Sequence, residues 1–435
     1  MNASPHNARV TVRIEGIAHD GRGVARRDGK AVFVAGALPG EDVDIRLTRT
    51  RGSHDEAVMV SVLRASPDRV TPPCPHAGAC GGCNLQHVSP LAQLASLQQR
   101  LVDTLARIAK VRPGAWMEPV ASLPWHYRSR ARLAVMRSTR DGSLAVGFRQ
   151  EESSRVEPIT ECRVLVPTLS GLPARLQCGL ASLDGPAMPS EIWLAAGDEG
   201  VGIGYCSRQA LSCEDRERLM SLSAELGASC GFGTLQGRQV RHWESPAPQL
   251  HYSPEAGLHL GFAPWDFTQA NREVNAVLVS RVLDALAPTD RDDVLDFFCG
   301  IGNFSLPLAR RARQVLGIEG SAAQVSTARA NAERNAITNC EFSAADLFQP
   351  GSLRLPKGRK FTLALLDPPR VGAAELCGHL RSLGLLKVAY VSCDAATLAR
   401  DAKTLCAQGF RLSTAGVLQM FPHTSHAEIL AVFER

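Results

Sequence analysis

The sequence predicts an α/β protein built from a small β-barrel, a central α+β domain and a C-terminal doubly wound α/β domain. Three observations carry this prediction. Short alternating strands occupy the first 67 residues, closely spaced cysteines follow, and strands alternate with helices from about residue 263 onward. We therefore expect domains at residues 1–67, 68–262 and 263–435.

Composition limits the class of protein to which this chain can belong. Hydrophobic residues make up 45% of the 435 positions and charged residues 21%, and no apolar run approaches the roughly 18 residues of a membrane helix. The first residues lack the hydrophobic stretch of a secretory signal, so we expect a cytoplasmic protein with no membrane partner. The 13 cysteines then predict thiols, metal ligands or catalytic groups rather than disulfides. Nothing in the pattern indicates an obligate protein partner, and we expect a monomer.

Short alternating segments indicate the barrel. They lie at residues 10–14, 31–34, 43–47 and 58–63, separated by a glycine-rich loop at 16–23 and a Pro39-Gly40 turn. Strands of this length and spacing are typical of a small OB-type barrel, a fold that often binds oligonucleotides. Arginines in its loops fit an RNA-binding surface as well as an ordinary solvated one.

Cysteines at metal-ligand spacing follow the barrel. Cys74, Cys80 and Cys83 have the spacing C-x5-C-x2-C in a loop rich in glycine and proline. Tetrahedral thiolate coordination needs a fourth ligand, and Cys162 is the candidate that the sequence favours. Spacing alone leaves structural zinc and a 4Fe-4S cluster as nearly equal alternatives.

A basic segment with aromatic neighbours lies in the central domain. Arg128, Arg130 and Arg132 alternate with small or apolar residues, just after Trp125 and Tyr127. On a β-strand these arginines project from one face, which suits a phosphate backbone, while the aromatic rings are available to stack on RNA bases. A basic exposed sheet face without RNA is the alternative.

The C-terminal domain opens with a glycine-containing turn between a strand and a helix. An apolar strand is predicted at 292–298, and the turn from Cys299 to Phe304 follows it. Glycines there allow a tight turn and close approach of a ligand to the helix N-terminus. The next strand ends in Glu319, 23 residues beyond Asp296, where an acid commonly binds ribose hydroxyls. No G-K-S/T follows the glycines, which excludes a P-loop.

Polar residues end the following strands as well. Asp346, Asp367 and Cys393 each come directly after a strand or strand-like run, and the carboxyl ends of parallel strands meet at one edge of such a sheet. A lone buried cysteine most often acts as a small hydrophobe, but these neighbours favour a ligand-binding edge. NAD-dependent oxidoreductases share this fold, whereas the run D-P-P-R at 367–370 favours a methyltransferase that uses S-adenosylmethionine.

A further acid precedes the final strand. Glu428 ends the run F-P-H-T-S-H-A-E and is followed by the apolar strand 429–433. Partial burial at that position would raise its pKa towards the range of a general base. A structural cap is the alternative role.

Several motifs together resemble the RNA uracil-5-methyltransferases. They are F-x-Q-x-N at 267–271, L-D-F-F-C-G-I-G-N-F at 295–304, L-L-D-P-P-R at 365–370, V-S-C-D-A-A-T-L-A-R-D at 391–401 and F-P-H-T-S-H-A-E at 421–428. The run G-I-A-H-D-G-R-G-V-A at 16–25 resembles a TRAM domain, an RNA-binding barrel. With this start and the four cysteines, the chain is most similar to the bacterial 23S rRNA (uracil-5-)-methyltransferases.

The resemblance implies an activity and a set of site residues. It implies methyl transfer from S-adenosylmethionine to C5 of a uridine in 23S rRNA, with Cys393 adding to C6 and Glu428 removing the C5 proton. It implies cofactor contacts at Gln269, Phe298, Asn303, Glu319, Asp346 and Asp367. It further implies that Cys74, Cys80, Cys83 and Cys162 bind a 4Fe-4S cluster, for which we expect a structural or RNA-positioning role. The family usually has Asn-Pro after the cysteine, and Asp394-Ala395 here leaves the geometry of that turn open.

Alternative functions remain at this point. The substrate could be another RNA uridine, in a tRNA or at a second 23S site. An N-methyltransferase is a different alternative, since D-P-P resembles the D/N-P-P-Y/F motif of amino-group methylation, although Arg370 replaces the aromatic residue. A non-catalytic iron–sulfur protein that binds RNA is the third.

Overall fold

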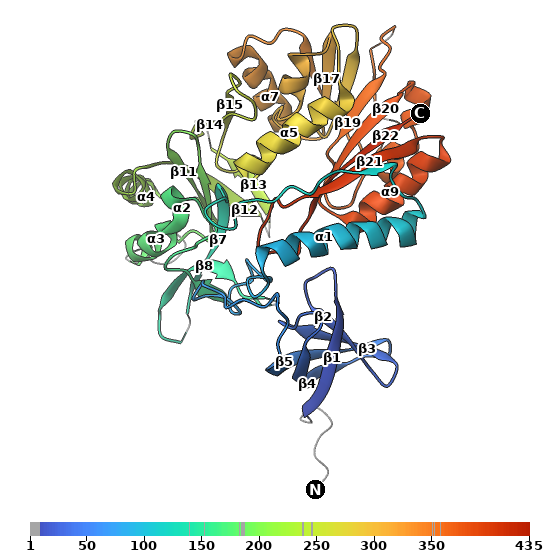
Figure 1. Cartoon of the computed structure of the whole chain (residues 1–435). Coiled ribbons are helices and arrows are strands. Elements are labelled where there is room, and N and C mark those ends of the chain that lie inside the picture. The colour runs from blue at the N-terminus through green and yellow to red at the C-terminus, as the bar shows by residue number, and fades with distance from the viewer. Residues whose placement is uncertain are drawn as a thin grey trace.

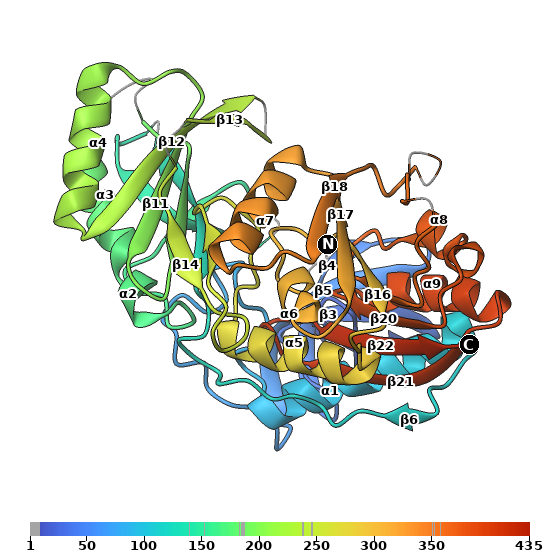
Figure 2. The ribbon, with the colours of Figure 1, turned by 90° about the horizontal axis from the view of Figure 1, so that it is seen from above.

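The computed structural model describes residues 9–138, 140–151, 153–181, 183, 188–236, 239–244, 247–349, 351, 353–356 and 358–435. The start of the predicted barrel domain, at residues 1–8, lies outside these ranges. Figure 1 shows the barrel below a long helix, with the central sheet on one side of the molecule and the C-terminal sheet on the other, and Figure 2 shows the two sheets from above. No helix within the described ranges is long and apolar enough to cross a membrane.

The N-terminal barrel closes from five strands. They are β1 (Arg9–Ile17), β2 (Gly23–Arg27), β3 (Lys30–Ala35), β4 (Asp42–Thr50) and β5 (His54–Arg64), hydrogen-bonded in the order β1-β2-β3-β5-β4. Alternate residues such as Val32, Val43 and Ile45 fill the interior and are fully buried. The predicted OB-type barrel is confirmed, but β2 was not predicted. It begins at Gly23, where a side chain would collide with the Ala37 carbonyl, so this strand lacks an apolar residue at its start.

A helix from the middle of the predicted central domain packs onto the C-terminal domain. α1 (Pro90–Thr104) runs into a π-helical turn (Leu105–Ala109), and Leu101 lies fully buried in the same core as α9 (Ala395–Ala407). A short strand, β6 (Ala115–Trp116), pairs in parallel with the outermost strand of the C-terminal sheet. The structure therefore differs from the predicted boundary, because this stretch shares its core with residues some 300 positions later.

The central domain contains a seven-stranded sheet. Its order is β13 (Gln239–Trp243), β12 (Ala228–Gln236), β11 (Val201–Ser207), β10 (Glu191–Ala196), β7 (Arg130–Arg137), β8 (Leu144–Arg149) and β9 (Val156–Pro158). One core joins this sheet to α2 (Pro167–Ser170), α3 (Leu172–Leu180) and α4 (Cys213–Glu225). A two-stranded ribbon, β14 (Leu250–Tyr252) and β15 (Leu260–Phe262), leads into the C-terminal domain.

The C-terminal domain has the predicted strand–helix alternation around an eight-stranded sheet. Its order is β18 (Cys340–Ala344), β17 (Gln314–Glu319), β16 (Asp293–Phe297), β19 (Leu363–Leu366), β20 (Lys387–Ser392), β22 (Glu428–Glu434), β21 (Arg411–Leu418) and β6. The connecting helices are α5 (Arg272–Leu286), α6 (Ser305–Ala309), α7 (Ala322–Arg334), α8 (Ala374–Cys377), the 3-10 turn Leu380–Leu383 and α9. The strands from β18 to β20 pair in parallel, whereas β22 is antiparallel to both of its neighbours. The predicted Rossmann-like class is confirmed.

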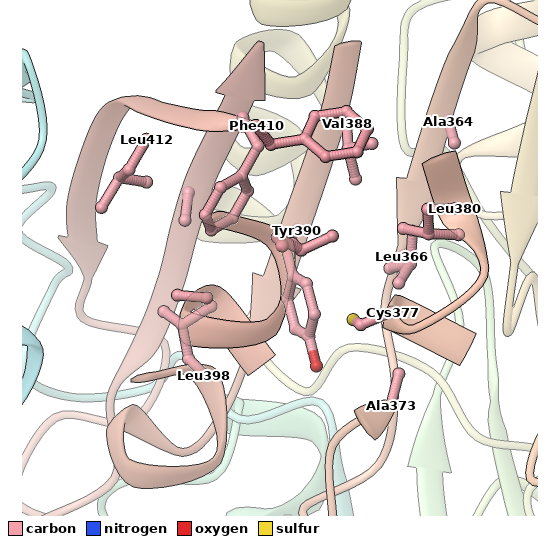
Figure 3. Close-up of a cluster of buried hydrophobic side chains, with 14 of the residues drawn as sticks. Ala364, Leu366, Ala373, Cys377, Leu380, Val388, Tyr390, Leu398, Phe410 and Leu412 are labelled. Carbon is pink, nitrogen blue, oxygen red and sulfur yellow. The ribbon is translucent and has the colours of Figure 1, made fainter. Parts of the chain in front are cut away.

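Both faces of this sheet are buried, because β20 sends alternate side chains into two cores. Val388 and Tyr390 pack with α9 and α1, while Ala389 and Val391 pack with α5. Figure 3 shows Val388 and Tyr390 in the first of these cores. The Tyr390 hydroxyl donates a hydrogen bond of 2.7 Å to the buried Asp401 carboxylate, so the polar end of this side chain is satisfied. A strand buried on both faces gives a rigid support for the residue at its end.

Candidate functional site

A cavity of about 530 Å³ lies at the carboxyl edge of the C-terminal sheet, where ligands bind in sheets of this kind. Every residue that the sequence analysis assigned to the cofactor or to catalysis lines this cavity. They are Gln269, Phe298, Asn303, Glu319, Asp346, Asp367, Cys393 and Glu428. The structure therefore brings these residues together, while their individual roles stay predictions.

The turn after β16 contains backbone conformations that few residues adopt. Phe298 has a φ of +64°, and Gly300 and Gly302 have φ values of +55° and +96°. The Phe298 amide donates to the Ile318 carbonyl at 2.8 Å, which joins the turn to the neighbouring strand. The Glu319 carboxylate accepts from the Gly300 amide at 3.2 Å. The turn and the acid at the end of β17 are thus held as one unit beside the cavity.

Asn303 is held beside the same turn by a small amide network. Its Oδ1 accepts hydrogen bonds from the Tyr252 hydroxyl at 3.0 Å and from Asn275 Nδ2 at 2.9 Å, and its Nδ2 donates to Asn275 Oδ1 at 3.0 Å. These partners fix the orientation of the amide. The rings of Phe298 and Phe348 also line the cavity, with centroids 5.8 Å apart. They give the cavity an aromatic wall that suits a flat heterocycle.

Cys393 and Glu428 meet through the register of two antiparallel strands. β20 pairs with β22 as far as Ser392 opposite Ile429, and one further step of this register sets Cys393 beside Glu428. Both residues line the cavity, and Glu428 is only 3% exposed. Strand pairing, rather than a flexible loop, therefore brings the thiol and the carboxyl together.

Asp394 occupies the position where the family resemblance led us to expect asparagine. Its carboxylate accepts two hydrogen bonds of 2.9 Å from amides in the first turn of α9, so it is the N-cap of that helix. Aspartate and asparagine cap helices about equally well. The turn after Cys393 therefore forms with Asp394-Ala395 in place, and the thiol stays at the end of its strand.

Burial dominates the electrostatics of the cavity. Burial, and after it the charge of Glu319, raises the pKa of Asp367 to about 7. Burial and the charge of Asp367 raise the pKa of Glu428 well above its ordinary value. Burial and then the charge of Glu428 raise the pKa of the Cys393 thiol to about 11, while the Arg370 guanidinium acts in the opposite direction. At neutral pH the site itself therefore holds a protonated thiol beside at least one protonated carboxyl group.

Arg370 is a charged residue of this site that the sequence analysis did not assign. It lines the cavity with Cys393, and its guanidinium lies 3.2 Å from a ring nitrogen of His426. Its place directly after D-P-P was the available signal, but a lone arginine in a loop does not reveal which strand end it faces. Tyr252 and Phe421 also line the cavity without having been predicted, because they come from separate segments that only the fold brings together.

The predicted metal ligands line a second cavity, of about 150 Å³. They are Cys74, Cys80, Cys83 and Cys162. Burial raises the pKa of Cys80 to about 11 and the pKa of Cys83 to about 12, and the neighbouring thiols contribute to both shifts. A bound cation would favour the thiolate forms of Cys80 and Cys83, which is the chemistry of a thiolate metal site.

The four cysteines are the donor set of this site. In the part of the chain that the structure describes, no three Cys, His, Asp or Glu side chains are arranged to hold a metal ion. Four cysteines are the usual ligands of a 4Fe-4S cluster and also bind structural zinc, so the donor set fits a thiolate metal site of either kind.

The arginines of the basic segment make separate contacts within the protein. Arg132 forms a two-point ion pair with Glu191, at 2.6 and 2.7 Å. Arg130 donates to the Thr268 carbonyl at 3.2 Å, beside the larger cavity, and Arg128 lines the cysteine cavity. The three arginines alternate with buried residues along this stretch, although the strand itself begins at Arg130 and each guanidinium has its own neighbours. Contact of these residues with RNA stays a prediction.

Comparison with known proteins identifies similar sequences along the whole chain. Residues 258–435 match the family model described as tRNA (Uracil-5-)-methyltransferase, and residues 4–54 match the TRAM domain. Relatives named 23S rRNA (uracil(1939)-C(5))-methyltransferase RlmD are 42% identical in Alcanivorax borkumensis, over 97% of this chain and 96% of the relative, and 41% identical in Alkalilimnicola ehrlichii, over 98% and 96%. The relative of that name in Pseudomonas entomophila is 42% identical, over 99% and 94%.

One solved structure is similar over nearly the whole chain. It is the crystal structure of Pyrococcus abyssi tRNA (uracil-54, C5)-methyltransferase in complex with S-adenosyl-L-homocysteine, which matches with a TM-score of 0.76 over 97% of this chain and 99% of that chain. At 24% identity, this likeness shows a shared fold.

Replacing Asp367 by asparagine tests how much this half-buried carboxyl group lowers the free energy of unfolding. The pKa of Asp367 is about 7 in the folded protein and about 3.9 in an unfolded chain, so the free energy of unfolding falls as pH rises between these values. Asp367→Asn removes this loss. We expect the variant to be more stable than the wild type at about pH 8, by on the order of 1–4 kcal/mol, and to differ less at about pH 5.

Urea unfolding at both pH values measures this effect. Asp292→Asn is the control with the opposite pH dependence. Hydrogen bonding from Thr289 lowers the pKa of Asp292, so the free energy of unfolding rises with pH as this group ionises. A stability difference for Asp367→Asn that is the same at both pH values would contradict the assignment of a raised pKa.

Proposed function

The chain belongs to the family of 23S rRNA (uracil(1939)-C(5))-methyltransferases, and from this premise we propose that it transfers a methyl group from S-adenosylmethionine to C5 of the corresponding uridine in 23S rRNA. The observation that carries the proposal is the meeting of Cys393 and Glu428 inside a cavity whose other walls match the expected cofactor positions. A thiol that can add to the ring and a base that can take the C5 proton are the groups that this reaction requires.

The residues around the turn after β16 suit S-adenosylmethionine. Glu319 stands at the end of the second strand, where an acid accepts hydrogen bonds from ribose hydroxyls in folds of this type. The rings of Phe298 and Phe348 are available to the adenine. We assign the remaining cofactor contacts to Gln269, Asn303, Asp346 and Asp367. When bound, the cofactor supplies the methyl group and a positive sulfonium charge, which favours the ionised forms of the neighbouring carboxyls and thiol.

Cys393 prepares the uracil ring for methylation. C5 of uracil is a weak nucleophile, so the Cys393 thiol first loses its proton to solvent, the thiolate forms a bond to C6, and the electrons of the C5–C6 double bond move into an enolate. The enolate carbon C5 then forms its bond to the methyl group while the bond from that methyl group to the sulfonium sulfur breaks, so that S-adenosylhomocysteine leaves. Arg370 is placed to favour the negative charge on the sulfur and on the ring, since its guanidinium already opposes the rise in the pKa of Cys393.

Glu428 completes the reaction. Its carboxylate takes the C5 proton, the electrons of the broken C–H bond restore the C5–C6 double bond, and the sulfur leaves C6 as a thiolate. The raised pKa of Glu428 makes the ionised carboxylate a stronger proton acceptor than an exposed glutamate. The cavity excludes bulk water from this step, since Glu428 is almost fully buried.

The RNA must present a single base to this cavity. A uridine inside folded RNA has to leave its stack before it can reach Cys393. We assign the holding of the flanking RNA to the N-terminal barrel and to Arg128, Arg130 and Arg132. Arg128 and Arg132 line the cysteine cavity and Arg130 lies beside the larger one, so we expect them to contact RNA close to the flipped base rather than along a distant groove.

The central domain is proposed to hold a 4Fe-4S cluster. Its ligands would be Cys74, Cys80, Cys83 and Cys162, which surround one cavity from two segments of the chain. The four-cysteine donor set, together with the family resemblance described in the sequence analysis, supports a cluster over a single zinc ion.

Two substitutions separate this reaction from other methyl transfers. We expect Cys393→Ala to abolish methylation of protein-free 23S rRNA, because it removes the thiol that adds to C6. We expect Glu428→Gln to form the bond to C6 and to transfer the methyl group. Product release should be at least about a hundredfold slower, since the variant has no carboxylate at this position to remove the C5 proton. The enzyme should then remain covalently attached to the RNA, which a denaturing gel measures.

Cys406→Ala is the matched control, because Cys406 lies on α9 just beyond Cys393 but does not line the cavity. Retained methylation by Cys393→Ala would contradict the uracil mechanism and favour an N-methyltransferase. Methylation of tRNA in preference to 23S rRNA would move the proposed substrate to another RNA.

Metal analysis tests the cluster. The protein purified without oxygen should contain about four iron atoms and four inorganic sulfides per chain. We expect Cys80→Ser to lose most of this iron and Cys178→Ser, an exposed cysteine outside the cavity, to keep it. Roughly one zinc per chain and no iron would contradict the proposal.

A further inference from the structure

The segment Phe421–Ser425 contacts residues of both cavities. Phe421 lines the larger cavity, and Glu428 follows a few positions later in the chain. The same segment contacts Trp125 and Arg128, both of which line the cysteine cavity. This stretch, which we call the wall segment, is therefore shared between the candidate active site and the four-cysteine site.

Aromatic side chains from the cysteine cavity hold the wall segment in place. Trp125 stacks on the His423 ring, with centroids 4.0 Å apart. Tyr127, which is 7% exposed, donates its hydroxyl hydrogen to the Pro422 carbonyl at 2.9 Å. Burial, and after it the nearby Cys83 thiol, raises the pKa of Tyr127, which places this residue beside the metal-binding loop.

The two residues that follow Cys83 reach the same segment. Asn84 accepts a hydrogen bond from the Ser425 amide at 3.0 Å. The Leu85 amide donates to the His423 carbonyl at 2.9 Å. Consecutive residues of the cysteine loop are thus joined to the wall segment by backbone and side-chain hydrogen bonds.

Gln93 of α1 supports these contacts from a third direction. Its side chain is 1% exposed, accepts from the His423 amide at 2.8 Å, and donates to the carbonyls of Leu85 and Val88 at 3.1 and 2.8 Å. A buried polar network of this kind holds its members in one arrangement, since any broken hydrogen bond leaves a buried group unsatisfied.

We propose that Asn84, Trp125 and Tyr127 are positioning residues through which the four-cysteine centre holds the wall segment and, with it, Glu428. The role of Glu428 in this inference rests on the proposed function. The link itself rests on the contacts alone.

The local structure explains why the wall segment needs such support. It adopts turns and bends only, with no helix or strand hydrogen bonds along its length. A stretch of this kind keeps its position through tertiary contacts. Glu428 is the first residue of β22, so strand pairing fixes the chain on its C-terminal side, while the chain that enters the strand on its N-terminal side is held by the contacts of the wall segment. The metal-binding loop therefore acts on the base without touching the substrate.

Hydrogen exchange of the full-length, metal-loaded protein tests the inference. The variants are Tyr127→Phe and Asn84→Ala, each of which removes side-chain hydrogen bonds to the wall segment. Tyr205→Phe is the matched control, because this buried tyrosine is hydrogen-bonded to Ser223 within the central core, away from the wall segment. The peptide spanning residues 419–428 reports the position of the wall, and iron content reports the cluster.

We expect exchange in this peptide to rise roughly threefold to tenfold in both variants and to stay unchanged in the control, with iron content kept. The kcat for RNA methylation should fall by a similar factor, while the KM for S-adenosylmethionine stays unchanged. Removing the metal from the wild type with a chelator and an oxidant should raise exchange in the same peptide.

Unchanged exchange in both variants would overturn the inference, and so would an equal rise in Tyr205→Phe, since that would indicate general destabilisation. A wild-type protein that does not methylate 23S rRNA but shows the expected exchange pattern would contradict the proposed function and leave the link standing.

Discussion

The antiparallel pairing of β20 with β22 is the interaction on which the candidate site depends. It sets Cys393 beside Glu428 by strand register, so their separation follows from backbone hydrogen bonds rather than from side-chain packing. The same pairing places the half-buried Cys393 and the buried Glu428 at the edge of a sheet whose faces are covered by helices. Burial raises the pKa values of the thiol and the carboxyl, so the free protein favours their protonated forms. A positive charge that enters the cavity then favours their ionised forms.

This arrangement lowers the free energy of unfolding, because it takes ionisable groups that the proposed reaction uses out of water. The half-buried Asp367 and the buried Glu428 are acids whose pKa values are raised, and each raises the pKa of a neighbour. Groups of this kind persist in a fold only where the surrounding structure holds them firmly. β20 is buried on both sides, whereas the chain just before Glu428 has no regular structure, which explains the dense contacts from the cysteine loop and α1 to the wall segment.

Much of the C-terminal domain and the polar residues at the ends of its strands could be predicted from the sequence. The sequence alone shows where a polar residue ends or follows an apolar strand, and Glu319, Asp367 and Cys393 each have that pattern. Features that depend on distant segments could not be predicted. The apolar pattern of residues 429–433 does not show that β22 runs antiparallel, and the leucines of α1 do not show which domain they contact. The internal contacts of the basic segment could not be predicted either, since alternation does not show that Arg130 donates a hydrogen bond to the Thr268 carbonyl.

The central claim is that Cys393 adds to C6 of a uridine and that Glu428 then removes the proton from C5. A 23S rRNA fragment with 5-fluorouridine at the target position tests this most directly, because fluorine at C5 cannot leave as a proton. With S-adenosylmethionine present, the account predicts a stable adduct of wild-type protein, RNA and one methyl group, which peptide mass spectrometry assigns to Cys393. No adduct, or an adduct at another of the 13 cysteines, would contradict the account.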